Sequence, residues 1–193
     1  MTDTERAAPT RLVAGAELPA PGRWQIDPGH TEAAFIGRHF MLTKVRGRFT
    51  GVTGTIVVAD EPGESTVEVT IDMASVESGS QARDDHLRSA DFFDTARHPT
   101  AAFCGRAAEW QGTQGLLAGE LTIRGITRPV TLQVGYLGHV ADPWGGQRAI
   151  FTAHGILNRE DWGLTWNMLL DGGGLLVSKD IGIEIEAEAV LQS

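Results

Sequence analysis

The stretch IGIEIEAEA, residues Ile181–Ala189, decides the fold. Apolar residues occupy its odd-numbered positions, and glycine or glutamate occupies the positions between them. Because successive side chains of a β-strand point to opposite faces, this pattern predicts a strand with one dry face and one wet face.

The same alternation recurs along the chain, in residues 67–73, 117–123, 130–136 and 150–156. A parallel sheet would show continuous apolar runs with amphipathic helices between them, and the chain has neither. About eight antiparallel strands with one dry face close on themselves when few helices can cover that face. We therefore predict an all-β fold, an eight-stranded antiparallel barrel, whose interior is either filled by side chains or holds a slender ligand. In residues 150–156 the alternation places His154 on the apolar side, as a hydrogen-bonded interior histidine.

One segment, RDDHLRSADFFD at residues 83–94, has no strand pattern. Ser78 with Gln81 three residues later has the spacing of a capping box, and His86 and Leu87 fall on one helical face. We expect a short helix here that closes one end of an apolar cavity.

Length and composition indicate one soluble domain. The 193 residues carry a formal net charge of -9, which argues against nucleic acid as a partner because phosphate neutralisation needs a basic face. Residues 1–21 are expected to be a loosely ordered arm, and residues 22–193 the barrel domain.

The single cysteine, Cys104, excludes an internal disulfide. No run of 18 apolar residues occurs, so no membrane insertion is expected, and Asp3 and Glu5 do not suit a basic leader, so we expect a cytoplasmic protein.

The residues that could carry chemistry fall into a polar set and an apolar set. No histidine pair has metal-ligand spacing, and no nucleophile motif is present, so neither a metal nor a catalytic residue is assigned. The polar set could contact a ligand head group or, equally, form an ion-paired cap that holds the helix to the barrel rim. The apolar set could line a pocket or be ordinary core. The polar set is His30, His39, Arg83, Asp84 and His86; the apolar set is Phe35, Phe40, Leu87, Phe92, Phe93, Trp162 and Trp166.

Several motifs follow one another in a fixed order. They are Trp24-x-Ile26-Asp27-x-x-His30-Thr31-x-x-x-Phe35, His39, Val45-x-Gly47-x-Phe49, the Arg83-Asp84-x-His86-Leu87 helix, Asp91-Phe92-Phe93-Asp94 with Pro99, Gly119-x-Leu121-Thr122-Ile123-x-Gly125-x-Thr127-x-Pro129-Val130, and Arg159-x-Asp161-Trp162-Gly163. In this order the chain resembles the YceI-like family, from residue 22 to about 191. The resemblance implies a lipocalin-like barrel that binds a polyisoprenoid or an isoprenoid quinone in its central tunnel, usually as a homodimer. Trp162 stands where the family more often has phenylalanine, a change that would shorten or reshape the cavity.

Three functions follow as hypotheses. The first is a non-enzymatic protein that sequesters or transports a long isoprenoid lipid, with no cofactor beyond that ligand. The apolar set would contact its chain, and His30, His39, Arg83 and His86 would lie near its polar end. The second is an enzyme that uses His30 or His86 as a general base, oriented by Asp27 or Asp84, on a hydrophobic substrate. The third is a filled barrel that serves as an interaction module through its strand edges or Trp144.

Overall fold

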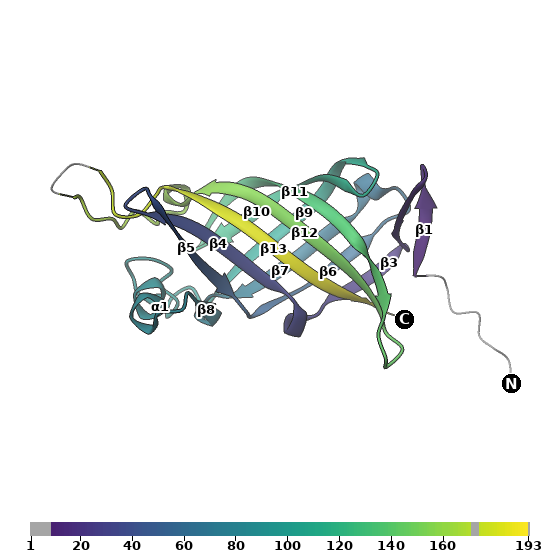
Figure 1. Ribbon diagram of the computed structural model, residues 1–193, viewed down its shortest axis with the longest axis horizontal. Helices are drawn as coiled ribbons and strands as arrows, with labels where there is room; N and C mark the ends of the chain where they lie inside the picture. Colours follow the sequence, from purple (N-terminus) through teal and green to yellow (C-terminus); the bar gives the residue numbers. More distant parts are fainter. Residues whose placement is uncertain (1–8, 171–173, 193) are drawn as a thin grey trace, which may run out of the picture.

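Strand β13 (Asp180–Leu191), which contains the alternating stretch, closes the barrel. In the computed structural model, which describes residues 9–170 and 174–192, β13 pairs with β12 (Gln147–Asn158) on one side and with β3 (Gly22–Ile26) and β4 (Glu32–His39) on the other. Every pairing in the barrel is antiparallel. Because β12 pairs with β13 as well as with β11, the sheet closes on itself and forms a barrel (Figure 1).

Three of the barrel strands are bent, and the bend divides each into two shorter strands. Strands β3 and β4 flank the 3-10 turn Pro28–His30 and lie along the same partner, β13. The other bent strands are β5 (Thr43–Phe49) with β6 (Val52–Val58), and β7 (Thr66–Asp72) with β8 (Val76–Glu77). The unbroken ones are β9 (Thr100–Gln111), β10 (Gln114–Ile123), β11 (Ile126–Ala141), β12 and β13. Counted in this way, the barrel has eight antiparallel strands, as predicted.

The two ends of the barrel are built differently. One end holds helix α1 (Gln81–Arg88), the β4–β5 turn, the β10–β11 turn and the connection from β12 to β13 (Figure 1, left). The opposite end holds the β6–β7, β9–β10 and β11–β12 turns together with both chain termini. Within the described residues no helix has the length and hydrophobicity needed to cross a bilayer.

The expectation of a loosely ordered arm over residues 1–21 is wrong for residues 10–19. These residues form a hairpin of β1 (Thr10–Val13) and β2 (Ala16–Pro19), with positive φ angles at both turn residues, Ala14 and Gly15. Leu18 is only 3% exposed and packs into a cluster with Trp24. The side chain of Arg11 donates hydrogen bonds to the carbonyls of Ala59 and Asp60 in the β6–β7 turn. Strands of four residues are too short to show a period, which is why the hairpin was missed.

The short helix is present, but the predicted capping box is wrong. The N-cap is Ser80, whose side chain makes no capping hydrogen bond. The hydroxyl of Ser78 instead donates to the Asp84 carboxylate and accepts a hydrogen bond of 2.8 Å from Arg83 Nε. Ser78 therefore ties together two charged side chains of the helix instead of satisfying its first backbone N–H groups.

Candidate ligand-binding cavity

The barrel contains a large cavity of about 500 Å³. Its wall is formed by the predicted inward faces, for example Val67, Val69 and Ile71 on β7 and Leu117 and Leu121 on β10. These side chains point inward and yet are only half-buried. In a barrel filled by its own side chains they would be fully buried, so their remaining surface faces an internal space. The volume lies within the usual range for small-molecule pockets.

The cavity stays open because large inward side chains lie flat against glycines of the wall. A Cβ added at Gly47 would lie 2.2 Å from Cζ of Phe35, its partner across β4 and β5. A Cβ at Gly155 would lie 2.5 Å from Cδ2 of Leu132. Because each glycine leaves room for its neighbour's side chain at the wall, that side chain does not reach into the centre.

The end of the cavity opposite α1 is closed by the N-terminal hairpin and a second hydrophobic cluster. Trp24 is fully buried, and its indole Nε1 donates a hydrogen bond of 3.1 Å to the carbonyl of Ala20. Tyr136 lies in the same cluster, where burial raises the pKa of its hydroxyl to about 12. Trp110 and Phe151 contact this cluster and also line the cavity. The hairpin thus covers the closed end.

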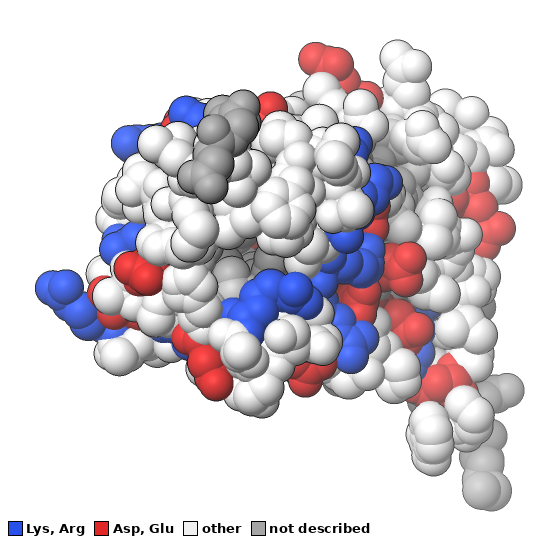
Figure 2. Space-filling view, turned by 60° about the vertical axis from the view of Figure 1, so that its left-hand side comes forward, with Lys and Arg blue, Asp and Glu red and all other residues white. Residues whose placement is uncertain are grey.

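The α1 end carries the mouth of the cavity. Figure 2 looks toward this end and shows a hollow with Lys and Arg side chains along its margin. From α1, Arg83, His86 and Leu87 line the cavity. The ring of His86 meets Trp166 edge-on, with ring centroids 4.5 Å apart, and its Nε2 lies 3.0 Å from a carboxylate oxygen of Asp91. The mouth therefore combines aromatic surface with donor groups.

The structure brings most of the predicted site residues to this cavity. Their role in ligand contact stays a prediction, but their position on the wall is observed. The predicted site residues that line the cavity are Phe35, His39, Arg83, His86, Leu87, Phe92, Phe93, Trp162 and Trp166. Trp162 is 3% exposed and fixed by a hydrogen bond of 3.0 Å from its Nε1 to the carbonyl of Leu121, so its larger ring forms a fixed part of the wall.

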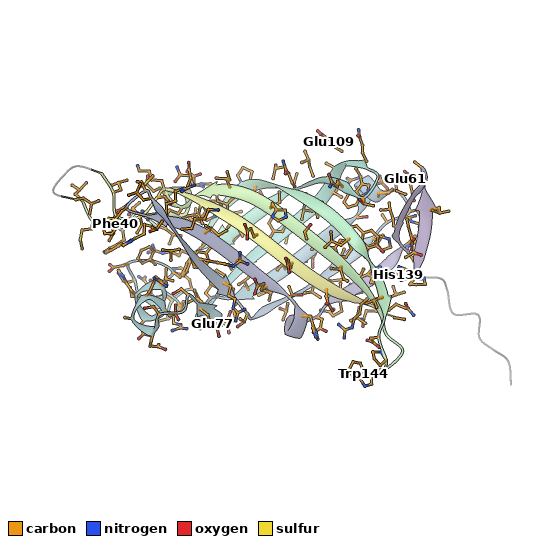
Figure 3. The ribbon with its side chains drawn as sticks, in the orientation of Figure 1. Phe40, Glu61, Glu77, Glu109, His139 and Trp144 are labelled. Atoms are coloured by element: carbon orange, nitrogen blue, oxygen red, sulfur yellow. The ribbon has the colours of Figure 1, made fainter. Side chains whose placement is uncertain are left out.

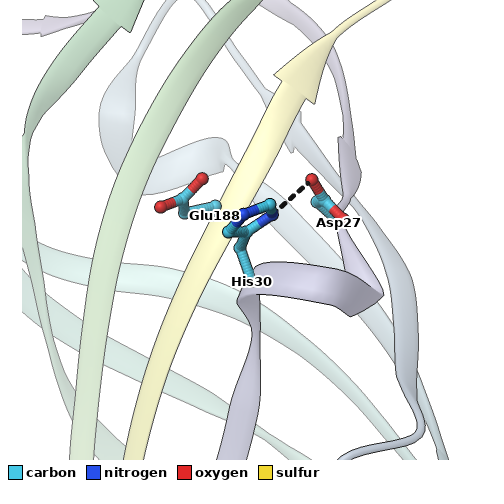
Figure 4. A group of neighbouring side chains, drawn as sticks. All are labelled: Asp27, His30 and Glu188. Carbon is cyan, nitrogen blue, oxygen red and sulfur yellow. Dashed lines mark hydrogen bonds and ion pairs between the residues drawn. The ribbon is translucent and has the colours of Figure 1, made fainter. Parts of the chain in front are cut away.

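His30 does not lie where the sequence placed it. It follows β3 on the outer surface, and its Nδ1 lies 3.0 Å from Asp27 Oδ2, with Glu188 close by (Figure 4). Strand β4 separates it from His39, so the two are roughly 25 Å apart along the chain. The cause is local, because the Asp27 side chain caps the turn that holds His30 and turns it away from the cavity.

The cluster of Asp27, His30 and Glu188 offers oxygen and nitrogen ligands for a metal, but an arginine already neutralises its two carboxylates. The Arg148 guanidinium hydrogen-bonds both Asp27 and Glu188, and it also donates to Asp142. This contact, above all, holds the pKa of Asp27 at about 2. A second cation beside Arg148 would be repelled, so the geometry fits a surface ion network that joins β3, β12 and β13.

Two other predicted contacts and one predicted interior residue are also corrected. Phe40 is 48% exposed at the tip of the β4–β5 turn (Figure 3) and is not among the residues that line the cavity. Asp84 is buried against Ser78 and does not orient His86, which pairs with Asp91. His154 is exposed on the outer face of β12. That strand carries apolar residues on both faces, so its period could not show which face is inside.

Sequence reasoning missed Arg159, a buried arginine on the cavity wall. It is 5% exposed, donates from Nε to the carbonyl of Ser178 at 2.9 Å and from Nη1 to the carbonyl of Leu164, and has no hydrogen-bond partner for Nη2 among the described residues. Burial lowers the pKa of its guanidinium. Its place in the Arg159-x-Asp161-Trp162-Gly163 motif, beside a predicted site residue, was the available signal.

The charged groups on the cavity wall are all basic. Arg38, Arg83 and Arg159 line the cavity at the α1 end, whereas no aspartate or glutamate of the described residues does. Neither Arg38 nor Arg83 forms an ion pair within residues 9–170 and 174–192. The charged side chains that line the mouth are therefore positive, although the chain as a whole carries a net charge of -9.

These features define a lipocalin-like barrel with an apolar cavity and a basic mouth. The chain belongs to the YceI-like domain family, whose model matches residues 24–189. It is 34% identical to Protein YceI of Escherichia coli O157:H7 over 180 residues, which is 93% of this chain and 91% of that one.

Solved structures of similar proteins agree with this fold. The YCEI protein of Campylobacter jejuni has a TM-score of 0.69 at 27% identity, covering 81% of this chain and 90% of that one. A domain from Saccharophagus degradans, described as polyisoprenoid-binding and implicated in plant cell wall breakdown, has a TM-score of 0.65 at 16% identity, covering 88% of this chain and 98% of that one. The second likeness concerns the fold alone.

Proposed function

We propose that the protein binds a long isoprenoid lipid in the barrel cavity and sequesters or transports it. The observation that carries this proposal is the cavity of about 500 Å³, which is apolar along its wall, covered at the hairpin end by the cluster that includes Leu18 and Trp24, and open at the α1 end (Figure 2). A slender, flexible apolar chain suits a long barrel interior better than a compact ring system does.

The tail of such a ligand would supply most of the affinity. Burial stabilises by about 0.8 kcal/mol per methylene-sized group, so each five-carbon isoprene unit would contribute roughly 3–4 kcal/mol before ordering costs. A charged hydrogen bond to the head group would add about 1.5–3 kcal/mol. The tail therefore sets the affinity, and the mouth sets which end enters first.

The basic mouth supports an orientation with the polar head at the α1 end. Arg83 lies there with guanidinium donors, and His39 and His86 line the same region. Since donors face the cavity at this end and carboxylates do not, a head group rich in acceptor oxygens fits best. A quinone carbonyl or a phosphate satisfies this chemistry.

The comparisons support the same ligand class, because a protein of this fold is described as polyisoprenoid-binding. We extend the proposal to a cytoplasmic carrier that acts as a homodimer. Light scattering of the purified full chain tests the dimer, and cell fractionation tests the compartment. A monomer at all accessible concentrations would remove the dimer from the proposal and leave the cavity proposal standing.

Mass spectrometry of an organic extract of the purified protein tests the ligand class directly. We expect a stoichiometric isoprenoid, and protein stripped of lipid should take up an added isoprenoid quinone. Val69→Trp should abolish this uptake, because Val69 faces the cavity and a tryptophan there would fill it. The matched control is Thr70→Trp, on the outer face of the same strand. Protein that is purified without lipid and also refuses the quinone would refute the proposal.

A further inference from the structure

Five large apolar side chains project from the α1 end of the barrel, and we call them the apolar tip. They are Phe40, Met41 and Leu42 of the β4–β5 turn, with exposed fractions of 48%, 50% and 78%, and Met168 and Leu169 of the β12–β13 connection, with 54% and 80%. The two segments are held side by side through Leu176, which accepts a hydrogen bond of 2.9 Å from Phe40 N and donates one of 3.0 Å to the Met168 carbonyl. The apolar tip is therefore one continuous surface.

The backbone of the β4–β5 turn holds these side chains outward at a conformational cost. Phe40 and Met41 have φ angles of 52° and 60°, and Leu42 N donates to the carbonyl of His39 at 3.0 Å. A turn with two consecutive positive φ angles favours Asn-Gly, and large apolar residues are uncommon there. Turn geometry does not account for Phe-Met-Leu at this place. The Phe40 ring packs on the His39 ring, with centroids 4.0 Å apart, yet Phe40, Met41 and Leu42 all stay about half exposed or more. Strained exposed residues of this kind indicate a binding role.

The apolar tip lies beside the mouth of the cavity. His39 and Trp166, which line the cavity, directly precede Phe40 and closely precede Met168 in the chain. Figure 3 shows Phe40 at this end of the barrel and Trp144 at the opposite end. A surface that covers the apolar tip would therefore face the entrance through which a ligand passes.

Within the described residues of its two segments, the charges that flank the apolar tip are positive. In the described parts of its two segments, residues 37–45, 166–170 and 174–177, the charged side chains are Arg38 and Lys44, which are paired across β4 and β5. Apolar side chains flanked by basic ones suit an anionic lipid surface, where the former enter the acyl boundary and the latter meet the head groups.

We propose that the apolar tip docks the protein on an anionic phospholipid bilayer, with the mouth of the cavity turned toward the membrane. Docking needs only the outer surface of the protein, so it goes beyond the proposed lipid-carrier function and can be tested without an isoprenoid. A bilayer fits this surface because the apolar tip adjoins the mouth of an apolar cavity and is flanked by basic side chains.

Cosedimentation of the full chain with vesicles tests the proposal. One set of vesicles contains phosphatidylcholine alone, and the other contains phosphatidylcholine and phosphatidylglycerol in equal parts. We expect binding to the anionic vesicles, weaker binding to the neutral ones, and a loss of about 10- to 100-fold in partition for the double variant Leu42→Ser with Leu169→Ser. Both leucines are so exposed that the fold should tolerate the change.

The matched control is Leu12→Ser with Leu137→Ser, which removes two leucines of 78% and 66% exposure near the opposite end of the barrel. It should bind vesicles like the unchanged protein. Equal losses in both double variants, or no binding of the unchanged protein to either vesicle, would overturn the proposal. A dimer that dissociates in the Leu42 and Leu169 variant, with vesicle binding unchanged, would show that a second copy covers the apolar tip instead. Quinone uptake from detergent solution by the same variant should be normal, which separates docking from ligand binding.

Discussion

The replacement Gly47→Ala tests whether glycines of the wall keep the cavity open. The added Cβ would lie 2.2, 2.7 and 2.8 Å from three ring atoms of Phe35, whereas carbon atoms pack at about 3.5–4.0 Å. The ring must therefore shift by roughly 1–2 Å, and the open direction is the cavity. Gly47 has no positive φ angle, so the cost is steric and not a backbone strain.

We expect Gly47→Ala to lower the free energy of unfolding by about 1–3 kcal/mol, the usual cost of overpacking. Urea denaturation followed by tryptophan fluorescence measures this change, and titration with an isoprenoid quinone should show weaker binding. In the background of Phe35→Leu, which removes the colliding ring, the same glycine replacement should cost much less. The two changes should therefore couple by about 1–3 kcal/mol in a double-mutant cycle.

The matched control is Gly63→Ala, because a Cβ at Gly63 meets no atom within 4 Å and its φ is not positive. This change should be neutral or stabilising by up to about 1 kcal/mol, through the unfolded chain. If Gly47→Ala were as stable as Gly63→Ala, or if Phe35→Leu failed to relieve its cost, the proposed role of glycine in keeping the ring at the wall would be refuted.

Three other predictions concern the closed end, the surface ion network and the mouth. Leu18→Ala should lower the free energy of unfolding by about 2–5 kcal/mol in thermal or urea denaturation, because Leu18 is 3% exposed, whereas Leu12→Ala, at 78% exposure, should change it by less than about 0.5 kcal/mol. The Asp27 carboxyl, with its pKa lowered from 3.8 to about 2 mainly by Arg148, should stabilise the folded protein above pH 4 and lose this contribution as the pH falls toward 2. Because the pair is partly solvated, Asp27→Asn should remove about 1 kcal/mol at pH 7 and flatten the acid limb of the stability profile. Arg83→Ala should weaken binding of an isoprenoid quinone by about 10- to 100-fold in a fluorescence titration and leave binding of a headless hydrocarbon such as squalene unchanged.

Each of these has an outcome that contradicts it. Equal effects of the Leu18 and Leu12 replacements would show that the hairpin does not close the barrel in solution. If Asp27→Asn left the stability profile at acid pH unchanged, the ion network would not stabilise the folded protein. Equal losses for quinone and squalene in Arg83→Ala would mean that Arg83 shapes the mouth without binding a head group.

The barrel could be predicted because the signal for each strand lies in residues that are close together in the sequence. Alternation such as that in Ile181–Ala189 depends only on neighbouring residues, and so does the helical spacing of His86 and Leu87. The inward faces of β7, β10, β11 and β13 line the cavity as predicted, since in residues 67–73, 117–123, 130–136 and 181–189 the large apolar residues lie on one face. For β12 the prediction failed, because Ile156 on its outer face is 75% exposed and as apolar as the residues inside.

The candidate site divides in the same way. The site residues on the helix and the aromatic residues at the barrel rim could be predicted, because their types and spacing are unusual in a β protein. The outward placement of His30 depends on the hydrogen bonds of the Asp27 turn, and the pairing of His86 with Asp91 in place of Asp84 depends on how the chain leaves α1. Neither arrangement has a periodic signal.

The amino-acid sequence by itself determined which residues alternate, how many strands result and where the one helix interrupts them, because those properties follow from each residue and its nearest neighbours. The tertiary structure alone decided that the interior is hollow. Whether Phe35 fills the centre or lies against the wall depends on the register that sets Gly47 opposite it, and register is a property of two strands together.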